Sequence, residues 1–129
     1  MEKNDSVLKT LEYPKVLSLL AECTATSLGR EQALALLPSA KFELVEQMLA
    51  ETDEAFKILN AAAAPPFGGM SDVSSFVQKA ALGSVLEPGD INLVGQSLFA
   101  ARRMKEFFAP LAEEKPLLAD IAAGLMPLR

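Results

Sequence analysis

The longest regular stretch of the chain is FELVEQMLAETDEAFKILNAA, residues 42–62. Its apolar residues recur at spacings of three and four, which places them on one side of a helix with 3.6 residues per turn. That side consists of Leu44, Val45, Met48, Leu49, Thr52, Ala55, Phe56 and Leu59. We expect Ser39 to be the N-cap and the helix to end before Pro65-Pro66, because proline cannot continue it. The rest of the chain is expected to cover this wide apolar side.

A second long helix is predicted for residues 88–109, with Pro88 in its first turn. Its expected buried stripe consists of Ile91, Val94, Leu98, Ala101, Met104 and Phe108. Several shorter helices are predicted from the same periodicity and from the proline and glycine breaks between the apolar segments. They cover residues 6–23 in one broken or two separate pieces, 28–37 behind a cap at Ser27, 71–83 behind a cap at Ser71, and 117–125. The fold class is therefore all-α, an irregular multi-helix fold, and residues 1–129 are expected to form a single helical domain.

Composition narrows the classes of function. The net charge is −5 and the pI is about 4.7, which argues against a domain that grips nucleic acid by itself, because phosphate neutralisation needs clustered Lys and Arg. The single cysteine, Cys23, permits no intrachain disulfide and fits a reducing cytoplasm. We expect Cys23 to be buried on the apolar face that it shares with Val16, Leu17 and Leu20; a reactive thiol would need a basic neighbour. The polar N-terminus has no signal peptide pattern, and no apolar run is long enough to span a membrane.

The sequence offers no catalytic, cofactor-binding or metal-ligating residues. Histidine is absent, and there is no cysteine cluster, phosphate-binding loop with Gly-Lys-Ser/Thr, or Gly-x-Ser-x-Gly motif. The carboxylates of Glu51, Asp53 and Glu54 lack partners at metal-ligand spacing and are interpreted as a solvated face. Gly68-Gly69 is interpreted as a turn rather than a phosphate cradle. The chain itself is therefore not expected to be an enzyme.

One basic cluster is a candidate nucleic-acid contact. Arg102, Arg103 and Lys105 form the densest group of positive charges, and Glu106 lies four residues after Arg102 and partly neutralises it. The alternative, which we favour, is a solvated helix face.

Seven short motifs occur in order along nearly the whole chain. They are Leu8–Tyr13, Thr26–Glu31, Leu36–Pro38, Glu51–Ala55, Pro66–Val73, Leu86–Pro88 and Arg102–Lys105. Each motif alone is weak, but the ordered series resembles the N-terminal part of a bacterial MutS-family protein. The branch that it resembles is the second one, the recombination-suppressing paralogue that lacks the mismatch-reading domain.

This resemblance implies a parent protein several times longer, with a lever, a clamp, a dimerising P-loop ATPase and often a nuclease domain. ATP and Mg are expected cofactors of that parent, which would act as a cytoplasmic homodimer on branched DNA or on stalled ribosomes. The present chain would supply a non-catalytic part of the helical core and lever base. The apolar end, Met126–Arg129, also suggests a longer polypeptide.

Two other functions are retained as alternatives. The first is a free-standing helical adaptor that binds a partner helix in an apolar groove beside the last helix. The second, which has less support, is a small-molecule enzyme, which would need a polar-lined pocket with perturbed carboxylates. The residues do not choose between DNA and the ribosome as target.

Overall fold

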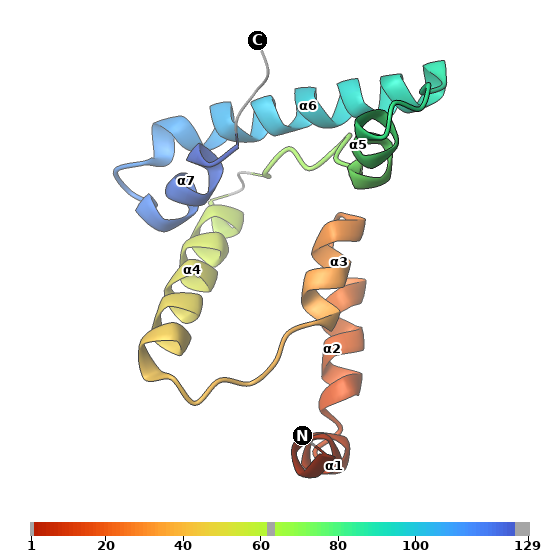
Figure 1. The fold of residues 1–129 in the computed structure, drawn as a ribbon. Coiled ribbons are helices and arrows are strands. Elements are labelled where there is room, and N and C mark those ends of the chain that lie inside the picture. The colour runs from red at the N-terminus through yellow and green to blue at the C-terminus, as the bar shows by residue number, and fades with distance from the viewer. Residues whose placement is uncertain (1, 62–63, 126–129) are drawn as a thin grey trace. The chain divides into compact units, whose positions relative to one another are not determined.

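The computed structural model describes residues 2–61 and 64–125. Every regular element in these ranges is helical, which confirms the all-α prediction (Figure 1). The helices are α1 (Glu2–Thr10), α2 (Tyr13–Glu22), α3 (Ser27–Leu34), α4 (Phe42–Asn60), α5 (Ser74–Ala81), α6 (Pro88–Phe108), the 3₁₀ turn η1 (Ala109–Leu111) and α7 (Pro116–Ala123). Backbone contacts divide the chain into two compact units, Met1–Pro38 and Ser39–Arg129. The single domain expected from the sequence stays a prediction.

The first unit is a helical hairpin preceded by a short helix. Residue Glu12, with φ of 56°, separates α1 from α2, and α2 packs against α3 (Figure 1). The buried residues of the two helices are Ala21 and Ala33, whose small side chains allow a close approach. The hydroxyl of Tyr13 donates to the carbonyl of Leu36 at 3.3 Å and so ties the start of α2 to the chain after α3.

Two sequence-based expectations for this unit are wrong. The N-cap of α3 is Thr26, not Ser27: Thr26 has an extended backbone, and its Oγ1 accepts the N–H of Gly29 at 3.0 Å. Cys23 is exposed rather than buried. The least exposed positions of α2 are spaced by four at Tyr13, Leu17 and Ala21, so the helix presents a different side from the one that carries Cys23.

In the second unit, α4 begins and ends close to the predicted positions but buries a different side. Its buried residues are Glu54 and Ile58, whereas Leu49 and Phe56 on the predicted buried side are 64% and 63% exposed. Among the described helices α7 makes the most extensive contact with α4, and it covers the Glu54 side near the C-terminal end. The predicted apolar side therefore lacks the cover that we expected from the rest of the chain within this unit.

The start of α4 also differs from the prediction. Its N-cap is Lys41, with no side-chain cap, and the Oγ of Ser39 instead accepts the N–H of Lys41 at 3.1 Å in the turn before the helix. The helix ends at Asn60, and the predicted last residue, Ala62, lies outside the described residues.

Helix α6 follows its prediction closely. Pro88 lies in the first turn, and the N–H of Glu87 donates to the carboxylate of Asp90 at 3.3 Å. Met104 and Phe108 are buried as expected, and Val94, Leu98 and Ala101 are half-buried. Ile91 is exposed, so its predicted burial is wrong: the stripe is covered only along the later turns. Helix α7 begins one residue before its predicted start and ends at Ala123, and the apolar end at residues 126–129 lies outside the described residues.

The segment before α5 is not helical, and hydrogen bonds to side chains fix its position. The predicted cap at Ser71 is wrong, because the Oγ of Ser97 accepts the N–H of Ser71 at 3.1 Å and donates to its carbonyl at 3.2 Å. This anchors the segment on α6 and delays the helix to Ser74, whose N–H donates to the carboxylate of Asp72 at 2.9 Å. At the other end, Gly83 has φ of 77° and stops α5 as predicted.

Hydrogen bonding to Ser74, through its side chain and then its backbone N–H, lowers the pKa of Asp72 below its usual value. The charged carboxylate is therefore favoured by folding, and its contribution to stability is present above the unfolded-state pKa and is lost as pH falls through the folded-state pKa. We expect Ser74→Ala to raise the pKa of Asp72 part of the way back, because the backbone donor remains. A carboxyl-detected NMR titration measures the pKa of Asp72, with Ser75→Ala as the control. Equal pKa values of Asp72 in the two variants would contradict the conclusion that the Ser74 side chain lowers it.

Gly69 is the position in the Gly68-Gly69 turn that requires glycine. Its φ is 88°, and a Cβ there would lie 3.6 Å from the carbonyl oxygen of Gln96 and 3.7 Å from the Cβ of Ala100. These are ordinary contacts, so the penalty of a side chain comes from the backbone conformation.

We therefore expect Gly69→Ala to lower the free energy of unfolding by about 1–2 kcal/mol, the cost of a left-handed non-glycine residue. Gly68→Ala is the matched control, because a Cβ at Gly68 would meet nothing within 4 Å. Urea denaturation of both variants measures the difference, and an equal loss in the two would show that the turn does not impose this conformation.

Candidate functional surfaces

The second unit is built around a junction of three helices. Its buried apolar cluster contains Ile58 from α4, Met104 and Phe108 from α6, and Ala122 from α7. Partly buried apolar side chains surround this cluster: Met70, Phe107, Leu111, Leu118, Ala119 and Leu125. Two long helices are thus fastened together near their C-terminal ends through the short α7, and we call this arrangement the α4–α6–α7 junction.

A buried carboxylate holds the start of α7. The two oxygens of Glu54 accept the N–H groups of Leu117 and Leu118 at 3.3 and 3.0 Å, and Glu54 is only 9% exposed. The first N–H groups of a helix have no partner within the helix, and the helix dipole favours a negative charge there. Glu54 therefore caps α7 from another helix, so its interpretation as part of a solvated face was wrong.

A lysine holds the other end of α7. The Nζ of Lys105 donates to the carbonyls of Ala123 and Leu125, each at 3.1 Å. A positive charge near the last carbonyls of a helix is favoured by the helix dipole. Each end of α7 thus faces a charge of the favourable sign, supplied by α4 at its start and by α6 at its end.

Sequence reasoning did not identify Glu54 as a functional side chain. The available signal was its spacing of four from Ile58, which places the two on one side of α4. The neighbouring side of the helix carries more apolar residues, so that side was predicted to be the buried one.

The structure gives the three members of the predicted basic cluster different surroundings. The Nε of Arg102 donates to the carboxylate of Glu106 at 2.8 Å on the surface. Lys105 binds the end of α7, and Arg103 is exposed. The nucleic-acid contact proposed for this cluster stays a prediction.

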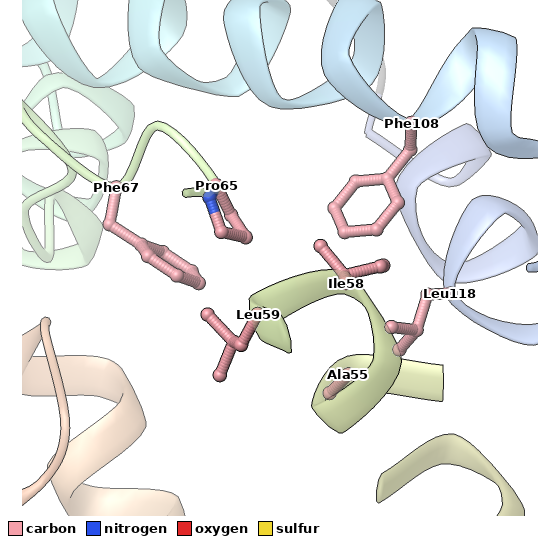
Figure 2. A pocket seen from close by; sticks show the side chains of 7 residues that line it. All are labelled: Ala55, Ile58, Leu59, Pro65, Phe67, Phe108 and Leu118. Carbon is pink, nitrogen blue, oxygen red and sulfur yellow. The ribbon is translucent and has the colours of Figure 1, made fainter. Parts of the chain in front are cut away.

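An apolar recess opens beside the junction. Figure 2 shows its seven lining side chains, which come from α4, α6, α7 and the segment between α4 and α5. They are Ala55, Ile58, Leu59, Pro65, Phe67, Phe108 and Leu118, and the volume is about 190 Å³. A second recess of about 250 Å³ shares Phe67, Phe108 and Leu118 with the first, and its lining is also apolar. Neither recess offers the acid or base groups that the small-molecule enzyme hypothesis requires.

The described residues 2–61 and 64–125 contain neither a cluster of metal ligands nor a membrane-spanning helix. Within these ranges, no three or more carboxylate or cysteine side chains come together as metal ligands. No helix in the same ranges is long and apolar enough to cross a membrane.

The described residues form an all-α segment in which the charged side chains of Glu54 and Lys105 connect helices and the two recesses are apolar. No family model matches the chain. Curated relatives match along almost its whole length: "Endonuclease MutS2" of Bacillus cereus (strain Q1) is 36% identical over 127 residues, 96% of this chain. The proteins of the same name from Bacillus thuringiensis (strain Al Hakam) and Bacillus anthracis are each 35% identical over 127 residues.

These similarities confirm the resemblance to the second branch of the MutS family: over 127 residues the chain is similar to a segment of proteins named MutS2. The chain spans only 16% of the length of the relatives that it matches.

Proposed function

We propose that the chain is a non-catalytic helical core segment of a longer MutS2-type ATPase. The observation that carries this proposal is the similarity to MutS2 proteins over 127 residues, which covers 96% of the chain but 16% of the relative. The parent would act in the cytoplasm as a homodimer on branched DNA, to suppress recombination, or on stalled ribosomes. ATP and Mg would bind in its ATPase domain, and the endonuclease in the name of the relatives would be a further domain of the parent.

The α4–α6–α7 junction suggests how such a segment would work. At 1.5 Å per residue, α4 with 19 residues is about 28 Å long and α6 with 21 residues about 31 Å long. These helices are held together at one point. The contacts there are the apolar cluster of Ile58, Phe108 and Ala122 and the hydrogen bonds at the two ends of α7. A helix pair that is fixed in this way moves as one body, and it would couple nucleic-acid-facing arms to the ATPase.

The test compares the isolated chain with the full-length parent protein. The chain alone is expected to hydrolyse no ATP and to bind a labelled four-way DNA junction weakly or not at all, because its net charge is −5. The full-length protein, assayed in parallel, is expected to show both activities. Tight DNA binding by the chain alone, with affinity that falls steeply as salt is raised, would contradict the proposal of a segment that depends on other domains.

A free-standing helical adaptor remains the alternative function. The exposed apolar side of α4 favours it, because such a surface suits a partner helix. This alternative expects a stop codon just after the codon for Arg129, whereas the proposed function expects a continuing reading frame.

A further inference from the structure

One side of α4 carries six exposed apolar side chains, which we call the α4 stripe. Its members are Phe42, Leu44, Met48, Leu49, Phe56 and Leu59. Their positions follow the helical repeat from the first residue of α4 to its last turn, so the stripe extends along almost the whole helix. An isolated exposed apolar residue is ordinary, but six of them along one side of a helix, with the exposed Thr52 between Leu49 and Phe56, mark an interaction site.

The second unit leaves the α4 stripe uncovered within its described residues. In this unit α4 packs on α7 through Glu54 and on the cluster from α6 and α7 through Ile58, and both residues lie on a different side of the helix from the stripe. The stripe is therefore not needed to assemble the α4–α6–α7 junction.

The borders of the α4 stripe are acidic. Glu46 and Asp53 lie along one border, and Glu51 lies along the other. Helix α4 contains five acidic side chains, Glu43, Glu46, Glu51, Asp53 and Glu54, and a single basic one, Lys57. Lys57 is paired with Asp53 and offsets its charge, so Glu46 and Glu51 give the borders the net negative charge that faces any helix lying on the stripe.

The α4 stripe ends in the apolar recess. Ala55 and Leu59, on the stripe side of the last two turns, line it together with Pro65 and Phe67 (Figure 2). Its volume of about 190 Å³ exceeds the roughly 150 Å³ of an apolar protein cavity that binds benzene. One aromatic or branched aliphatic side chain would therefore fit there as an anchor.

We propose that the α4 stripe binds an apolar helix bordered by lysine or arginine, and that the longer polypeptide to which this segment belongs supplies that helix. Complementary charge on the borders fixes the register of such a pair, while the apolar contact supplies most of the affinity. The relatives extend far beyond the matched 16% of their length, so they contain the chain needed for the partner helix. This inference rests on the proposed function.

The same charges argue against a second copy of the chain as occupant. Two α4 stripes packed on one another would bring acidic borders together, and like charges placed opposite one another destabilise an interface. A basic border on the partner helix removes this repulsion.

The experiment uses the 129-residue chain and peptides of about 20 residues, the length of α4. The peptides are fluorescently labelled and tiled across the polypeptide encoded downstream of Arg129, and fluorescence anisotropy measures their affinity for the chain. We expect at least one peptide with an apolar stripe and basic borders to bind, and its affinity to fall as salt is raised. A version of that peptide with Lys and Arg replaced by Glu is expected to bind at least about tenfold more weakly.

Matched variants of the chain locate the binding surface. Phe56→Asp places a charge in the α4 stripe and is expected to weaken peptide binding by at least about tenfold, while Glu46→Lys weakens it by severalfold. Leu82→Asp is the control, because Leu82 is 84% exposed but lies at the end of α5. All three positions are exposed, so circular dichroism is expected to show unchanged helix content.

Three results would overturn the docking proposal: no tiled peptide binds, the bound peptide has acidic borders, or Phe56→Asp binds as well as the unchanged chain. A dimer of the chain that Phe56→Asp dissociates in analytical ultracentrifugation would assign the stripe to a second copy and also overturn it. A downstream ATPase frame without a binding peptide removes only this inference. A stop codon after Arg129 removes the proposed function as well.

Discussion

Replacing Phe108 by alanine is expected to lower the free energy of unfolding by about 3 kcal/mol, the lower end of the range for a buried phenylalanine. Phe108 belongs to the buried cluster of the α4–α6–α7 junction, and its ring meets that of Phe107 edge-on, with centroids 5.1 Å apart. It also lines both apolar recesses. We expect the lower end of the range because the neighbouring side chains can move into the space that the ring leaves.

Phe99→Ala is the matched control on the same helix. Phe99 is 63% exposed, so its truncation is expected to change the free energy of unfolding by no more than about 0.5 kcal/mol. Urea denaturation followed by circular dichroism compares the two variants. Equal losses for Phe99→Ala and Phe108→Ala would show that the junction is not the core of this unit.

Replacing Glu54 by alanine is expected to lower the free energy of unfolding by about 1.5–3 kcal/mol, the usual contribution of hydrogen bonds to a charged group. The substitution removes both acceptors of the α7 N-terminus, at Leu117 and Leu118, and the negative charge that its dipole favours. Glu54→Gln keeps one acceptor oxygen and loses the charge, so we expect an intermediate loss. Urea denaturation measures both variants.

Glu46→Ala serves as the control for the loss of a carboxylate from α4. Glu46 is exposed, and its replacement is expected to change stability by less than about 0.5 kcal/mol. A loss for Glu46→Ala as large as that for Glu54→Ala would show that the total charge of α4, rather than the cap on α7, decides the effect.

Helix positions were predictable because local signals determine them. Pro88 and Gly83 mark a start and a stop that the structure retains, and α4 begins at the predicted residue, Phe42. The caps at Ser39, Ser27 and Ser71 were not predictable to the residue. Several serine, threonine and aspartate side chains compete near the starts of α3 and α5, and at α5 a distant partner, Ser97, holds Ser71.

The buried side of α4 was not predictable from its own sequence. Periodicity shows that a helix has an apolar side, but it does not show which element lies against that side. In this chain α7, about 60 residues further along, covers the Glu54 side, and the larger apolar side remains exposed in its own unit. Sequence periodicity thus detected the apolar side of α4 correctly, but it did not show that the other described helices of this unit leave that side exposed.

The candidate functional surfaces were predictable only in part. The apolar junction residues Met104 and Phe108 follow from the stripe of α6. The capping roles of Glu54 and Lys105 require two long-range contacts each, and a single sequence contains no signal for these contacts. Lys105 was grouped with Arg102 and Arg103 because charge clustering is visible in sequence, whereas the end of α7 is not.

The most direct measurement is to sequence the reading frame downstream of the codon for Arg129. Our account predicts a continuous frame of several hundred codons that encodes Gly-x-x-x-x-Gly-Lys-Ser/Thr, the phosphate-binding loop of an ATPase. That result would assign the chain as a helical core segment of a MutS2-type protein. A stop codon close to Arg129 would contradict the account and would favour the free-standing helical adaptor.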